Sequence, residues 1–246
     1  MMPTKNDSPS PPAGTEWGAI FFALVFPTVL TWVYFIALAD SAPWLQKGAY
    51  GIGKVIQFAF PLIFVLFARR ERLAFRGIDT SGLVLAIGFG LLVSGSMLAL
   101  YHFWLKPAGF FAGPVTDEVE TKLKSFGVDT LLPYAALAVF YSLVHSFLEE
   151  YYWRWFVFGR LKNLTPLSAA IAISSVGFAA HHVLVLAKYF GWGSPATWLF
   201  SAGVAIGGVV WAIIYQRSKS LLGPWLSHLL VDAAIFAIGW DLMTPA

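Results

Sequence analysis

The sequence predicts an all-α fold, a polytopic transmembrane helical bundle of about seven membrane helices. Hydrophobic residues make up 58% of the 246 residues and charged residues only 12%, which is about half the charged fraction of a typical soluble domain. The mean hydropathy is +0.71. Seven apolar stretches reach, or nearly reach, the roughly 20 residues that a helix needs to cross a bilayer. We therefore expect an integral membrane protein.

The predicted elements follow one another with short polar connections. Residues 1–15 are polar and rich in proline and serine, so we expect a disordered polar tail before a single transmembrane domain at 16–246. The fourth stretch begins near Pro133 and reaches two adjacent glutamates, and the segment 106–130 is either an interfacial helix or a loop. The other apolar stretches lie at 17–39, 49–68, 83–105, 166–187, 195–215 and 224–240.

The basic residues lie mostly between the apolar stretches, and the net charge is only +3. This distribution indicates orientation in a bilayer and no nucleic-acid partner. The absence of cysteine excludes disulfides and thiolate metal sites. Basic clusters follow the second, fourth and sixth stretches, so the positive-inside rule predicts a cytoplasmic N-terminus and an outside C-terminus, in the cell inner (plasma) membrane. These clusters are Arg69, Arg70, Arg72 and Arg76; Arg160 and Lys162; and Arg217 and Lys219.

Several ionisable residues interrupt the last four apolar stretches, where a charge costs several kcal/mol. Glu150 and Arg154 are four residues apart and can pair on one helix face. Glu149 points about 100° away from Glu150, so this pairing leaves one carboxylate without that arginine. The alternative interpretation is that the charges mark the end of a membrane helix, where they reach water.

Histidines occupy the later stretches. His181 and His182 lie near the middle of the fifth, with Phe178 on the same face as His182, and His228 and Asp232 are four residues apart in the seventh. Each set has a plain structural explanation, as a packing histidine or as a polar pair that holds helices together. Together, on three helices, they are the groups that can activate water or bind a metal.

The spacing of these residues resembles three motifs of the CPBP family, also called the ABI or CAAX-protease-like family of intramembrane proteases. Glu149-Glu150-x-x-x-Arg154 resembles its EExxxR motif, Phe178-x-x-x-His182 its FxxxH motif, and His228-x-x-x-Asp232 its HxxxN/D motif. The motif-bearing core is 130–240, and the first three helices match only in being hydrophobic.

The resemblance implies an endopeptidase that hydrolyses a peptide bond in a membrane-associated or lipid-modified protein or peptide. Glu149 would be the general base that activates water, and His182 would hold that water with it. Glu150 and Arg154 would orient the site through an ion pair. His228 and Asp232 would complete it as water ligands, metal ligands or oxyanion support. The partners implied are the lipid bilayer and a peptide or protein substrate.

The resemblance leaves the cofactor and the class of protein open. The HExxH zinc signature is absent, so we favour a glutamate mechanism with no cofactor. Zinc is the alternative, with Glu149, His182 and His228 as its ligands. The alternative to an enzyme is a non-catalytic polytopic membrane protein, a scaffold, immunity-type factor or transporter, that keeps the motif residues as structural polar contacts. No role is assigned to His145 or His181.

Overall fold

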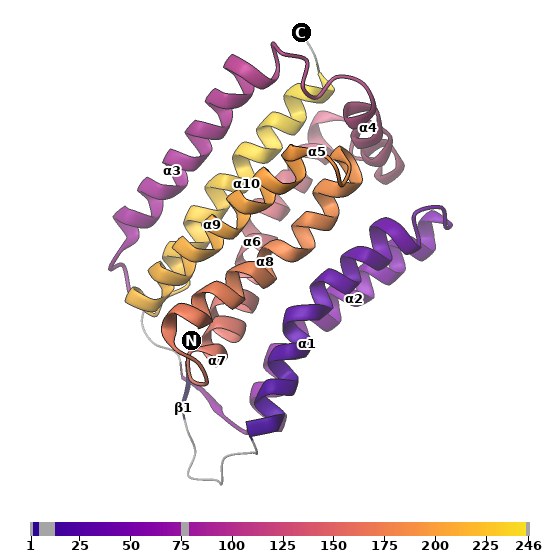
Figure 1. Cartoon of the computed structure of the whole chain (residues 1–246). Coiled ribbons are helices and arrows are strands. Elements are labelled where there is room, and N and C mark those ends of the chain that lie inside the picture. Colours follow the sequence, from indigo (N-terminus) through magenta and orange to yellow (C-terminus); the bar gives the residue numbers. More distant parts are fainter. Residues whose placement is uncertain (1, 5–12, 75–78, 245–246) are drawn as a thin grey trace. The chain divides into compact units, whose positions relative to one another are not determined.

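The computed structural model describes residues 2–4, 13–74 and 79–244 (Figure 1). Within these residues, seven helical segments are long and apolar enough to cross a membrane. The prediction of an all-α integral membrane protein is confirmed, and six spans lie close to the predicted stretches. The seven spans are Gly14–Ala37, Pro43–Ala68, Leu83–Leu105, Leu131–Leu161, Leu167–Phe190, Pro195–Ser218 and Leu222–Met243.

The chain forms two compact units. The first comprises residues 1–79 and 151–216, and the second comprises residues 80–150 and 217–246. The prediction of a single domain at 16–246 stays a prediction. The boundary between the units falls inside the fourth span, directly after Glu150.

The first unit is built from helices and one short strand pair. Helix α1 packs against α8 and α2, and Figure 1 shows α1 and α2 side by side. The helical elements are α1 (Ala13–Trp32) with its π-helical end η1 (Val33–Ala37), α2 (Pro43–Ile63) with η2 (Phe64–Ala68), η5 (Tyr151–Phe158), α7 (Gly159–Leu161), α8 (Leu167–Phe190) and α9 (Pro195–Ser218).

The predicted disordered tail, residues 1–15, lies largely outside the described residues. Within it, Met2–Thr4 forms strand β1, which pairs antiparallel with β2 (Arg72–Ala74), Met2 opposite Ala74. Residues 13–15 already belong to α1. The residues Met2–Thr4 thus pair with the segment after the second span, and the prediction of a disordered tail stays a prediction.

A proline in α1 leaves a backbone carbonyl that is hydrogen-bonded by a side chain of the fourth span. Pro27 has no backbone N–H, so the carbonyl of Ala23 cannot accept its usual hydrogen bond four residues on. The buried hydroxyl of Tyr152 donates to that carbonyl at 2.8 Å. Inside a bilayer such a carbonyl needs a partner from another group. Tyr152 thereby ties α1 to η5.

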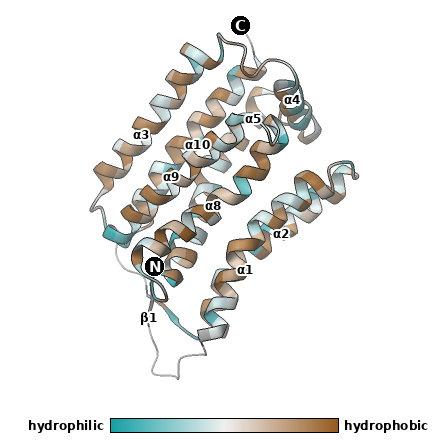
Figure 2. Cartoon of the chain, in the orientation of Figure 1, coloured by the Kyte–Doolittle hydropathy of each residue, from teal (hydrophilic) through white to brown (hydrophobic). Residues whose placement is uncertain are grey.

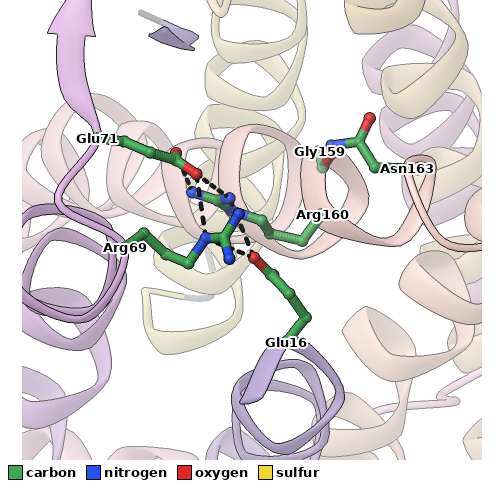
Figure 3. A network of polar contacts seen from close by, with 6 residues as sticks. All are labelled: Glu16, Arg69, Glu71, Gly159, Arg160 and Asn163. Carbon is green, nitrogen blue, oxygen red and sulfur yellow. Dashed lines mark hydrogen bonds and ion pairs between the residues drawn. The ribbon is translucent and has the colours of Figure 1, made fainter. Parts of the chain in front are cut away.

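Two arginines and two glutamates form a buried ion network at one end of this unit (Figure 3). Arg160 makes a two-pronged contact with Glu71, at 2.6 and 2.9 Å. Arg69 Nε lies 2.8 Å from Glu16 Oε1 and 3.2 Å from Glu71 Oε1. Burial raises the pKa of the Glu71 carboxyl, but the hydrogen bonds and charges of Arg160 and Arg69 outweigh burial and hold that pKa below its ordinary value.

This network and a neighbouring contact show which helix ends lie at the same membrane face. The network joins the start of the first span, the end of the second and the end of the fourth. Lys162, just after the fourth span, donates to Gln216 near the end of the sixth at 3.4 Å. The ends of spans two, four and six therefore share one face, as the alternating arrangement of helices requires.

The second unit contains the third and seventh spans and the first part of the fourth. Helix α3 packs along α10. Its helical elements are α3 (Leu83–Leu100) with η3 (Tyr101–Leu105), α4 (Pro114–Phe126), α5 (Leu131–Val139), η4 (Phe140–His145), α6 (Ser146–Glu150) and α10 (Leu222–Met243).

The polar segment 106–130 folds as a helix over part of its length. Helix α4 begins after Gly113 and ends at Gly127, whose φ of 69° is the left-handed conformation that favours glycine at a helix end. No side chain of α4 is buried, and Figure 2 shows hydrophilic residues concentrated on it. Of the two alternatives, the helix is the one the structure contains.

Close approach of α3 to α10 depends on Gly90. A Cβ atom added at Gly90 would lie 3.0 Å from both the Cα and the carbonyl oxygen of Ser227. Toward the other end of the pair, Asp241 accepts hydrogen bonds from the Tyr101 hydroxyl at 2.7 Å and from Lys106 at 2.6 Å. These contacts fix the position of α10, which carries His228 and Asp232.

The fourth span differs from the prediction. The alternative that the glutamates mark a helix end in contact with water is wrong, because the span runs on to Leu161 and the glutamates are buried. The helix continues because the residues that follow, Tyr152–Phe158, are themselves buried. An acidic pair interrupts the apolar pattern of a sequence, but the membrane helix itself ends there only if the charges must reach solvent.

Candidate active site

Four of the six predicted site residues come together in the second unit. Glu149 and Glu150 end α6, and His228 and Asp232 lie one turn apart on α10. Glu149 is 4% exposed, Glu150 0% and His228 4%. Carboxylates and imidazoles taken this far from water need polar partners nearby.

His228 lies at the centre of this group. Its Nδ1 is 2.9 Å from Glu150 Oε1, and because an ionised carboxylate only accepts, Nδ1 donates this hydrogen bond. Its Nε2 lies 3.5 Å from Asp232 Oδ1 and 3.8 Å from Glu149 Oε2. One imidazole thus joins three carboxyl groups from two spans, so His228 and Asp232 are not a self-contained pair.

The structure gives Glu150 a partner that the sequence did not suggest. Its hydrogen bond to His228 comes from another helix, whereas the motif suggested Arg154, four residues along the same helix. Glu150 and Arg154 belong to different units, so their pairing stays a prediction. The same holds for the meeting of Glu149 with His182.

Arg154, in the first unit, lies against two aromatic rings that contact each other. Its guanidinium carbon lies 4.8 Å from the Phe178 ring centre and 5.2 Å from that of Trp211, and the residue is 1% exposed. Arginine is attracted to aromatic faces, and the attraction is strongest away from water. Phe178 belongs to a motif, but Trp211 was not singled out, because a tryptophan in an apolar helix carries no sequence signal of its own.

His182 takes a defined tautomer from the same Phe178. Its Nδ1 lies 3.0 Å from the Phe178 carbonyl oxygen, which can only accept, so Nδ1 is the donor and Nε2 carries the lone pair of the neutral ring. The two rings meet edge to face at 5.0 Å. Phe178 therefore contacts both Arg154 and His182, which gives the FxxxH spacing a physical meaning.

His181 points into an aromatic environment instead. Its ring stacks on Trp153, with the ring centres 6.1 Å apart and the planes 5° from parallel, and meets Phe178 at 5.8 Å. The residue is buried. Its ring centre also lies 4.1 Å from that of its neighbour His182, which is more exposed.

The zinc alternative needs three or four ligand side chains close together. In the described part of the chain, no three His, Asp or Glu side chains are arranged to hold a metal ion. His182 belongs to the other unit, so zinc bound by Glu149, His182 and His228 stays an alternative.

The fold and the site together define a class, that of polytopic helical membrane proteins with a buried acid–imidazole cluster. Residues 130–234 match the family model "Type II CAAX prenyl endopeptidase Rce1-like". The match is shorter than half of the chain, but it includes all three motifs, and it confirms the predicted resemblance of this region to the CPBP family of membrane proteases. No curated protein and no solved structure matches the chain.

Proposed function

We propose that this protein is an intramembrane endopeptidase that hydrolyses a peptide bond in a membrane-associated or lipid-modified protein or peptide, with Glu149 activating the water. The observation that carries the proposal is the buried contact of His228 with Glu150 at 2.9 Å, which directs Nε2 of the same ring toward Glu149 and Asp232. The match to a family described as prenyl endopeptidases supports the reaction class.

In the proposed reaction, Glu149 accepts a proton from water while the water oxygen attacks the scissile carbonyl carbon. The carbonyl oxygen becomes an oxyanion. When the tetrahedral intermediate collapses, the carbon–nitrogen bond breaks and the proton held by Glu149 passes to the leaving nitrogen. The products are a carboxylic acid and an amine, so one water molecule is consumed.

The other residues act around this proton transfer. His228 is oriented through its Nδ1 bond to Glu150, and in its doubly protonated form its Nε2–H faces the developing oxyanion, where a placed donor stabilises charge. Asp232 holds Nε2 from the same helix. The role of His182, holding the water through Nε2, and the role of Arg154, orienting the glutamates, rest on the motifs.

We further propose that the N-terminus is cytoplasmic, in the cell inner (plasma) membrane, and that the substrate is cut near the cytoplasmic face. Support comes from the shared face of the ends of spans two, four and six. Basic residues follow each of these ends in the sequence, and the positive-inside rule assigns such ends to the cytoplasm. The prenyl group in the description of the family makes a prenylated peptide the first substrate to test.

Membrane proteomics of cells that carry the protein, an E149Q variant or no protein tests the proposal. We expect peptide products that appear with the wild-type protein and are missing with E149Q, at equal protein levels. The matched control is E118Q, the same chemical change on the exposed helix α4, which should leave the products unchanged. A non-catalytic scaffold would give the same peptides with E149Q as with the wild type.

A further inference from the structure

His145 lies next to the proposed base but belongs to none of the three motifs. It is the last residue of η4, four residues before Glu149. Its Nε2 is 3.9 Å from Glu149 Oε1, and its side chain is only 14% exposed. On its other side the ring faces Tyr141, with the ring centres 4.7 Å apart.

Glu149 therefore has one imidazole at each carboxylate oxygen. His145 faces Oε1 at 3.9 Å, from the same helix, and His228 faces Oε2 at 3.8 Å, from α10. These distances are longer than direct hydrogen bonds, as is common for catalytic contacts before substrate binds. A contact at one oxygen leaves the carboxylate able to rotate, whereas contacts at both oxygens fix the plane of the group.

We propose that His145 is a positioning residue for Glu149, a role that rests on the proposed function. It holds Oε1 while His228 holds Oε2, so that the carboxylate presents one oxygen to the water in a single orientation. The other ionisable groups of this cluster are Glu150 on α6 and Asp232 on α10, and both lie on the His228 side of the carboxylate. His145 lies on the Oε1 side.

The competing explanation is that the ring of His145 only packs against Tyr141. Two variants separate the explanations. H145F keeps a ring of similar size for Tyr141 but removes the nitrogen near Oε1. H145Q loses the ring but places an amide N–H close to the position of Nε2. A positioning role and a packing role therefore predict opposite orders of activity.

The experiment measures kcat and KM of the purified full-length protein, using the peptide whose cleavage E149Q abolishes in membranes, or a farnesylated peptide. We expect H145F to lower kcat about 10- to 100-fold, the range that a misplaced catalytic group can cost, with KM within about twofold. H145Q should recover most of that loss. H102Q, a histidine change on an exposed residue of η3, should match the wild type.

Near wild-type kcat for H145F, or equal losses for H145F and H145Q, would overturn the role of His145 while E149Q remains inactive. Cleavage by E149Q, or no E149Q-dependent cleavage at all, would overturn the proposed function and this inference with it. If H145F does not fold, H145N takes its place, because its shorter amide does not reach the position of Nε2. Equal kcat for H145N and H145Q would then contradict the proposal.

Discussion

Replacement of Tyr152 by phenylalanine removes one hydroxyl and leaves the Ala23 carbonyl buried without its donor. Hydrogen bonds between membrane helices contribute about 0.6 kcal/mol on average and up to about 1.7. A buried carbonyl left without a partner costs about 1–3 kcal/mol. Since the bond is 2.8 Å long and fully buried, we expect Y152F to lower the free energy of unfolding by about 1–2 kcal/mol.

The proline explains why this bond is needed, and so it provides the control. In P27A the alanine N–H can donate to the Ala23 carbonyl within α1, so the carbonyl keeps a partner when the tyrosine hydroxyl is gone. We expect Y152F to cost about 0.5 kcal/mol or less in the P27A background, which makes the coupling energy of the double-mutant cycle about 1 kcal/mol.

Reversible unfolding of the four proteins in mixed detergent micelles, followed by circular dichroism, measures the cycle. A coupling energy below about 0.3 kcal/mol, the usual error of additivity, would refute the idea that Tyr152 compensates for Pro27. So would an equal loss of stability from Y152F in both backgrounds.

Three more predictions concern the packing, the charges and the cofactor. G90A should lower activity about tenfold, because its Cβ would press on Ser227, the neighbour of His228. The control G95A lies on the same helix, and its Cβ would meet no atom within 4 Å, so it should keep wild-type activity. Equal activities of G90A and G95A would contradict this prediction. Because the pKa of Glu71 is lowered in the fold, its ion pairs contribute their full stability when the pH is above the ordinary pKa of 4.5. This contribution is lost as the pH falls through the lowered pKa of the native state. Thermal unfolding should therefore show a steeper acid loss for the wild type than for E71Q, and parallel curves would argue against it. Activity should survive a zinc chelator, whereas loss with chelator and recovery with added zinc would favour the metal alternative.

The sequence was sufficient to predict the membrane spans, because hydropathy is summed over about 20 residues and tolerates local exceptions. It also predicted that charged and imidazole groups of the fourth and seventh spans belong to one site. His228 confirms their proximity by binding Glu150 from another helix. The i, i+4 spacing of charged residues predicts pairs within a single helix. It therefore predicted Arg154 as the partner of Glu150 and could not reveal a partner from α10.

Other contacts could not be predicted, since they depend on how helices pack. The bond from Tyr152 to Ala23 follows from Pro27, but many tyrosines could have supplied the hydroxyl. The tryptophan beside Arg154, Trp211, is one of 11 tryptophans in the chain, and nothing in its local sequence distinguishes it. The fourth span was predicted to reach only the glutamates because the sequence does not reveal that their charges are buried.

The role of Glu149 as the base that activates water is tested most directly by the rate of peptide cleavage in purified protein. With equal amounts of folded protein and saturating peptide, E149Q should lower kcat by at least about 100-fold, the smallest contribution expected of a general base, while E118Q cleaves at the wild-type rate. Cleavage by E149Q within about threefold of the wild type, well inside that minimum, would contradict the account.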